Sequence, residues 1–313
     1  MQRTHFRSGA RRGPAPRVRR KVSGAGEASL DDWLTECRPG WALPGKFHSD
    51  ETIYRAGLDR VWRTGWLFSG HTCEIPKPGG YFTLQVDADP LVVIRGPAGA
   101  LHGLHNVCRY RGSTIFDHYN TDDTTPRIKR EISGVITRSE RKWKAAGLAP
   151  THTQTGMTMF PDAENGVWFS ANRTPLVEGY LSETMDGQRV APLMGDYQDA
   201  DVGTLRIRTL PNFWNHSSCD HAVSTRLLPA GPQLTAIRVW WLVDAQAEEG
   251  RDYQLEKLMP FWQLTSEQDW EICERQQRGV NSSAFVPGPY SAYKEYNVEG
   301  FVRWYLQQLQ AKT

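Results

Sequence analysis

Three apolar, β-prone stretches stand in the second half of the sequence and are followed by two helical stretches. The strand-like segments are "VGTLRIRTL", "HAVSTRLL" and "TAIRVWWLV", each rich in residues that favour extended backbone. A helix is expected from Tyr253 to Arg278, with Gly279 ending it, and a last helix from about Val298 to Gln310. Strands followed by long helices are typical of an α+β fold.

The first half predicts one helix and a small antiparallel β-unit. In "FHSDETIYRAGLDRVWRTGWLF", Ser49 is the expected N-cap, and Ile53, Leu58 and Val61 belong to an apolar stripe at helical spacing. The segments "GGYFTLQV", "LVVIRG" and "LHGLHNV" then resemble short strands separated by Pro and Gly.

Composition narrows the class of protein. The chain has 313 residues and a formal net charge of +2, which argues against general attraction to nucleic acid or membrane. It has no apolar run of about 18 residues and no apolar N-terminal segment of the secretory kind. The cysteines are odd in number and scattered, which favours reduced thiols in a cytoplasmic protein over a disulfide framework. They are Cys37, Cys73, Cys108, Cys219 and Cys273.

Two segments are strongly basic. Met1 to Lys21 carries eight basic residues and no acidic one, so it could be a nucleic-acid or lipid-contacting arm, a transit peptide or a disordered tail. We favour a disordered tail over residues 1–40, because Pro and Gly interrupt any helix and Phe6 is the one aromatic residue among the arginines of the first 21 residues. Arg127 to Lys144, with seven basic and two acidic residues, is interpreted as the solvated face of a helix.

Longer segments resemble a known family. "LPGKFHSDETIYRAGLDRVWRTGWLFSGHTCEIPKPGGYFTLQV" and "LHNVCRYRGS" resemble the start of the oxygenase (alpha) subunit of Rieske-type non-haem iron oxygenases. "SANRTPLVEGYLSETMDG", "LPNFWNHSSCDH" and "SEQDWEICERQQRGVNSSAFVPGPYS" resemble its end. The chain is most similar to the branch that contains the glycine betaine monooxygenase, from about Leu43 to the C-terminus apart from one junction.

The resemblance implies O₂-dependent monooxygenation, demethylation or ring hydroxylation of a small molecule. Electrons would come from a reductase or ferredoxin, and the subunits would form a homotrimer. The family uses a [2Fe–2S] Rieske cluster, held by C-x-H and C-x-x-H, and a mononuclear Fe(II) held by two His and one carboxylate. A quaternary amine is the expected substrate type, for which tryptophans could supply a cation–π box.

Most of the implied cluster ligands are missing from the sequence. Cys108 matches the first cluster cysteine, but Tyr110 replaces the first histidine. The next cysteine is Cys219, so no C-x-x-H follows. Three of the four ligands are therefore absent, and a phenol is a poor substitute for a neutral imidazole.

The implied iron site is incomplete as well. Asp269 matches the carboxylate position, but its two histidine partners are absent. The pair His216 and His221 has a five-residue offset, which on one strand would place the two side chains on opposite faces. We interpret both as structural histidines.

The missing ligands lie around one junction, near Ile115 and Phe116, which a single internal deletion in the gene or an error in the gene model would explain. The expected fold is a truncated antiparallel β Rieske lobe (residues 41–115) and an incomplete helix-grip-like, START-like catalytic domain (residues 116–313). We expect a catalytically inert relative of these oxygenases. An active oxygenase and, less well supported, a nucleic-acid-binding protein are the alternatives.

Overall fold

The computed structural model describes residues 4–6, 29–106, 169–174, 176, 179–291 and 295–311. Its largest element is a six-stranded antiparallel sheet in the order β1-β9-β8-β7-β6-β5. The strands are β1 (Thr4–Phe6), β5 (Phe169–Thr174), β6 (Thr204–Thr209), β7 (Phe213–Ser217), β8 (His221–Gly231) and β9 (Leu234–Val243). The three strand-like segments of the second half are thus confirmed as β6, β8 and β9.

A second, three-stranded antiparallel sheet is built from the first half of the chain, as the sequence predicts. Its strands are β2 (Tyr81–Val86), β3 (Asp89–Arg95) and β4 (Leu101–His105). Alternate residues of β2 are buried, among them Phe82 and Leu84, and they pack against Leu228 of β8. The small sheet therefore covers one face of the large one.

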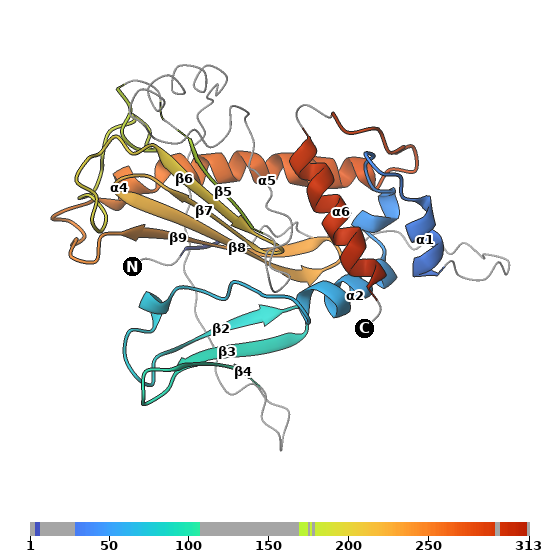
Figure 1. The fold of residues 1–313 in the computed structure, drawn as a ribbon, viewed down its shortest axis with the longest axis horizontal. Helices are drawn as coiled ribbons and strands as arrows, with labels where there is room; N and C mark the ends of the chain where they lie inside the picture. The colour runs from blue at the N-terminus through green and yellow to red at the C-terminus, as the bar shows by residue number, and fades with distance from the viewer. Residues whose placement is uncertain are drawn as a thin grey trace, which may run out of the picture.

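Helices cover the opposite face and one end of the large sheet (Figure 1). The helices are α1 (Leu30–Glu36), α2 (Glu51–Gly57), α4 (Leu255–Leu258), α5 (Pro260–Val280) and α6 (Tyr296–Gln310). Shorter helical turns are η1 (Gly45–His48), η2 (Leu58–Trp62) and η3 (Thr72–Glu74). Helix α5 runs along the face of the large sheet that the small sheet does not cover, while α1, α2 and α6 gather at one end.

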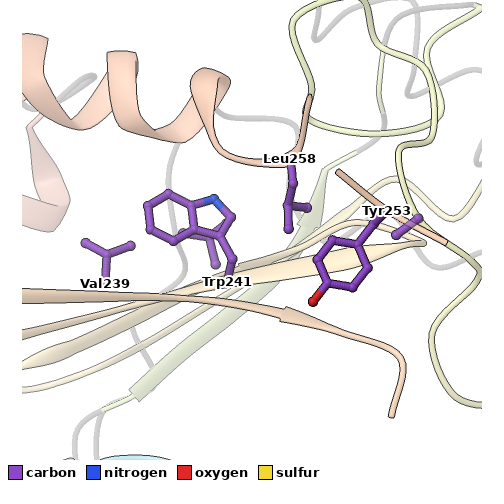
Figure 2. Close-up of a cluster of buried hydrophobic side chains, with 6 residues drawn as sticks. Val239, Trp241, Tyr253 and Leu258 are labelled. Carbon is purple, nitrogen blue, oxygen red and sulfur yellow. The ribbon is translucent and has the colours of Figure 1, made fainter. Parts of the chain in front are cut away.

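The strict alternation of strand side chains explains this layering, because successive residues point to opposite faces. Val239 and Trp241 of β9 face α4 and α5, where they pack with Tyr253 and Leu258 (Figure 2). Arg238 and Trp240, the intervening residues, face the small sheet. Burial of this apolar cluster fixes α5 on the sheet, since each large side chain removed from water contributes roughly 1.5–3 kcal/mol.

Several helix boundaries differ from the sequence prediction. Asp50, not Ser49, caps α2, because its carboxylate accepts hydrogen bonds from the backbone N–H groups of Thr52 and Ile53. The predicted long helix is divided into α4 and α5 at Pro260, which lacks the N–H that a continuous helix would need. Helix α5 passes through Gly279 to Val280, so this glycine is not its end.

The prediction of a disordered tail over residues 1–40 is wrong for two segments. Ser29 caps helix α1 in a reciprocal capping box with Asp32, and Trp33 of this helix is buried with Ile53 and Leu309. Thr4–Phe6 form edge strand β1 against β9. The rest of the basic N-terminal segment and the basic 127–144 segment lie outside the described residues.

The described helices include none with the length and apolar content needed to cross a membrane.

Candidate functional site

The face of the large sheet beneath α5 carries a group of polar and aromatic side chains. In β6, Arg206 and Arg208 are two residues apart and share one face. The antiparallel register places Arg206 opposite His216 of β7 and Arg208 opposite Trp214. His216 contacts Trp262 of α5, with ring centroids 4.3 Å apart. The four strand residues therefore lie on the α5 side.

Glu183, from the segment before β6, brings a carboxylate to this face. It is 7% exposed, and its Oε1 accepts a hydrogen bond of 3.3 Å from Nη2 of Arg206. Its Oε2 lies 3.8 Å from Nδ1 of His216, and neither of these two atoms forms a hydrogen bond. Burial raises the pKa of Glu183, but His216 and Arg206 together outweigh it and leave the pKa below its usual range.

The protonation states of this group follow from its burial. Burial lowers the pKa of His216, and the nearby Glu183 reverses only part of that effect. Because His216 is then neutral near pH 7, we assign the stabilisation of the Glu183 carboxylate mainly to Arg206, not to a charged imidazole. The arrangement is a Glu183–Arg206 ion pair beside a neutral histidine.

Asp269, the residue that matches the family's iron carboxylate, lies on α5. Desolvation raises the pKa of its carboxyl, and the nearby His216 acts in the opposite direction. Its side chain is exposed, so the shift in pKa does not indicate a buried charge.

The described residues do not fit a mononuclear iron bound by two histidines and a carboxylate. Among them, no three His, Cys, Asp or Glu side chains are grouped so that they could hold a metal ion. Of the histidines that the structure describes, only His216 influences the pKa of Asp269, and its Nδ1 faces Glu183. A facial set of two imidazoles and one carboxylate, which such iron requires, is not assembled by the described side chains.

The donors for a Rieske cluster do not fit either. Cys108 and Tyr110 lie outside the described residues. Cys219, the next cysteine along the chain, is fully buried, and its Sγ donates to the carbonyl oxygen of Leu181 at 3.3 Å. Burial raises the pKa of Cys219 to about 12, so it is a protonated thiol, whereas a metal ligand must be a thiolate.

His221 belongs to a separate, buried network. Its Nδ1 lies 2.9 Å from Oδ1 of Asp220, which also accepts a 2.5 Å hydrogen bond from Ser182. All three side chains are at most 1% exposed. Although Ser, His and Asp occur together, the serine donates its hydrogen bond to the aspartate and lies 3.3 Å from the same Nδ1 of His221 that faces the aspartate. It is also buried and closed to substrate, which is unlike a hydrolase triad. The network ties the segment around Ser182 to the β7–β8 hairpin.

The two histidines are not placed as the sequence suggested. His216 is in β7 and His221 begins β8, so they lie on adjacent strands that flank a turn instead of on one strand. That they are structural, not iron ligands, stays a prediction. Sequence reasoning missed Glu183, Arg206, Arg208 and Trp262, although the alternation in "TLRIRT" already places the two arginines on one face.

Comparison with known proteins identifies relatives of this architecture. The family model described as "Ring hydroxylating alpha subunit (catalytic domain)" matches residues 126–311, more than half of the chain. The glycine betaine monooxygenase oxygenase subunit of Chromohalobacter salexigens is 29% identical over 389 residues, covering 88% of this chain and 87% of that protein. The N,N-dimethyl phenylurea N-demethylase subunit alpha of a Sphingobium species is 28% identical over 239 residues, covering 73% and 47%.

Solved structures with the same fold share little sequence with this chain. The quaternary ammonium Rieske monooxygenase CntA in complex with gamma-butyrobetaine superposes with a TM-score of 0.58 at 14% identity, over 91% of this chain and 100% of that one. Naphthalene 1,2-dioxygenase from a Rhodococcus species gives a TM-score of 0.55 at 14% identity, over 91% and 99%. At this identity the likeness concerns the fold.

Proposed function

Because this chain belongs to the family of ring hydroxylating alpha subunits, we propose that it is a non-catalytic member of it. In this proposal the chain holds neither a Rieske cluster nor a mononuclear iron, and by itself it oxidises no substrate. The single observation that carries the proposal is the donor set. The sequence has one Cys-x-Tyr in place of Cys-x-His and no Cys-x-x-His after it.

An internal deletion accounts for the missing donors. The alignment with the Chromohalobacter relative extends over 389 residues, whereas this chain has 313, so the relative has residues without a counterpart here. We place the junction near Ile115 and Phe116. On this basis the small sheet is the remnant of a Rieske lobe, and the large sheet with α5 is an incomplete helix-grip-like catalytic domain. Sequencing the gene across these two codons tests the junction.

The experiment that tests the proposal is metal and sulfide analysis of the purified chain with a visible spectrum. We expect iron and acid-labile sulfide far below one cluster per chain and no absorption of an imidazole-ligated two-iron centre. Cys108→Ser is the matched control, and it should leave the iron content unchanged. Stoichiometric iron and sulfide that disappear in Cys108→Ser would overturn the proposal.

The alternative is an active oxygenase of the cytoplasm, working in a homotrimer with a reductase or ferredoxin. Its substrate would be a small quaternary amine, the class of compound after which the Chromohalobacter glycine betaine monooxygenase and the quaternary ammonium monooxygenase CntA are named. Asp269 favours this alternative, because the family's carboxylate position is retained. It requires histidine and cysteine donors that the sequence does not supply. Association of the inert chain with intact oxygenase subunits remains open to test by co-purification.

A further inference from the structure

Strand β4 is the outermost strand of the small sheet, whose order is β2-β3-β4 (Figure 1). All five of its residues are exposed, and two of them are apolar: Leu101 is 43% exposed and Leu104 is 55% exposed. The strand has no Lys, Arg, Asp, Glu or Pro, the residues that ordinarily keep an edge strand from pairing with another chain. An unprotected edge of this kind is a template for a further strand.

The direction of each peptide group in β4 follows from two hydrogen bonds at the ends of the β3–β4 ladder. The N–H of Gly96 donates to the carbonyl oxygen of Ala100 at 2.8 Å, and at the other end the N–H of Asn106 donates to that of Pro90, also at 2.8 Å. Both bonds join residues that lie directly opposite each other when the register of this ladder is extended. Such pairs alternate with pairs that exchange no hydrogen bond, so the direction of the residues between the two ends is fixed.

This alternation leaves the outward edge of β4 open. His102 and Leu104 belong to the hydrogen-bonded pairs, so their peptide groups point to β3. The backbone N–H and C=O groups of Leu101, Gly103 and His105 therefore point away from β3. Within the described part of the chain, no hydrogen bond reaches these outward groups. Every second residue of β4 thus offers a donor and an acceptor at the edge.

The open edge is complementary to itself about Gly103. When two copies meet antiparallel with Gly103 opposite Gly103, Leu101 of one copy lies opposite His105 of the other. Each outward pair can then exchange both hydrogen bonds, so that donors face acceptors along the whole edge. No Lys, Arg, Asp or Glu of β4 opposes another, and nothing lies within 4 Å of a Cβ built at Gly103. The contact is the same patch on both copies, so it closes at a dimer.

We propose that β4 is a docking edge for β4 of a second copy of this chain, which joins the two small sheets into one continuous sheet with a two-fold axis at Gly103. This assembly goes beyond the proposed loss of catalysis and does not depend on it, because the open edge follows from the β3–β4 register. Metal and sulfide analysis tests the earlier proposal, whereas the oligomeric state tests this one. The failure of either is therefore distinguishable from the failure of the other.

The test is sedimentation equilibrium of the full chain at protein concentrations from about 1 µM to 1 mM. One short strand on each side is a small contact beside the roughly 1,200–2,000 Å² that stable complexes bury, so we expect a weak, reversible equilibrium between monomer and dimer. A chain that stays monomeric over the whole range, or one that forms a trimer without a dimer, would overturn the proposal.

Substitutions at Gly103 assign the contact to β4. Gly103→Pro removes the outward N–H but leaves the ladder to β3, a position at which an edge strand accepts proline. The dissociation constant of the dimer should rise about tenfold or more, because both hydrogen bonds on the two-fold axis are lost. Gly103→Ala is the matched control, since it adds a side chain and keeps the N–H, and it should change the constant by less than about threefold.

A charge exchange tests the register and does not depend on the proline variant. Gly103→Lys and Gly103→Glu each place like charges directly opposite on the two-fold axis, so each alone should dimerise more weakly than the wild type. An equimolar mixture of the two should associate more tightly than either alone, because opposite charges then face each other. Circular dichroism shows whether each variant folds. A folded Gly103→Pro variant that dimerises like the wild type, or a mixture that associates no more tightly than its components, would contradict the proposal.

Discussion

Both faces of the large sheet bury arginine side chains, but the partners of the guanidinium groups differ between the faces. On the face toward the small sheet, Nη2 of Arg238 lies 2.8 Å from Oε2 of Glu74, and both side chains are almost completely buried. Arg226 donates to the carbonyl oxygen of Ser69. Both guanidiniums also stack on Trp240, with their central carbons 4.8 Å and 5.3 Å from the ring centroid for Arg238 and Arg226.

On the face toward α5, one of the two arginines has neither a carboxylate nor a carbonyl partner among the described residues. Arg206 pairs with Glu183, while Arg208 has no such partner among the described residues. The difference shows that a buried arginine in this sheet can have either of two environments. Where a partner and an aromatic ring are supplied by the fold, the cation joins two sheets. Where they are missing, the cation has no counter-ion among the described residues.

The largest expected effect on stability comes from removing the paired arginine Arg238 on the face toward the small sheet. Arg238→Leu leaves the Glu74 carboxylate buried without its guanidinium, so the free energy of unfolding should fall by about 3–5 kcal/mol, the usual cost of removing one member of a buried pair. Urea unfolding followed by tryptophan fluorescence measures it. Adding Glu74→Leu should restore part of the loss, since an apolar pair leaves no orphaned charge. A loss below about 1 kcal/mol would mean that the pair does not join the sheets.

A smaller effect is expected from histidines on the two faces. Burial lowers the pKa of His71, which contacts the rings of Phe68 and Trp240 edge to face, and of His216 beneath α5. Both are neutral when folded, whereas the unfolded chain binds protons near pH 6.5. Stability is therefore fully present above that pH and declines as the pH falls below it, by roughly 1 kcal/mol in total between pH 6.5 and 5.5.

Unfolding curves at pH 7.5, 6.5 and 5.5 check the sign. His216→Gln should remove the contribution of the α5 face to the pH dependence of the free energy of unfolding. His71→Gln should remove the contribution of the other face. The carboxylates whose pKa is lowered, such as that of Glu183, titrate at lower pH and do not contribute in this window. Stability that rises between pH 6.5 and 5.5 would show that these histidines are charged when folded.

The smallest expected effect on stability comes from replacing Arg208 on the face toward α5. Arg208→Met should change the free energy of unfolding by no more than about 0.5 kcal/mol, because it removes a desolvated charge and breaks no ion pair while retaining the stem. Thermal unfolding measures it. A loss as large as that of Arg238→Leu would show that Arg208 has a structural partner, and the contrast between the faces would vanish.

Much of the architecture is contained in local sequence patterns. Alternating apolar residues predict β6, β8 and β9, and the stripe of Ile53, Leu58 and Val61 predicts the helix that α2 and η2 form. The cap of α2 was assigned one residue early because Ser49 and Asp50 are both good caps, and only the backbone geometry selects between them. Pro260 marks the boundary between α4 and α5, although the apolar pattern by itself predicts one continuous helix.

The sequence by itself determined two things: which side chains share a strand face, and which family ligands are missing, since both depend on the order of residues along the chain. Only the tertiary structure decided which face lies under α5, and that Glu183 reaches Arg206 instead of Arg208. It likewise brought Glu74 to Arg238, 164 residues away. Charge pairing acts over a few ångströms in space, so contacts between distant segments decide which buried charges are neutralised.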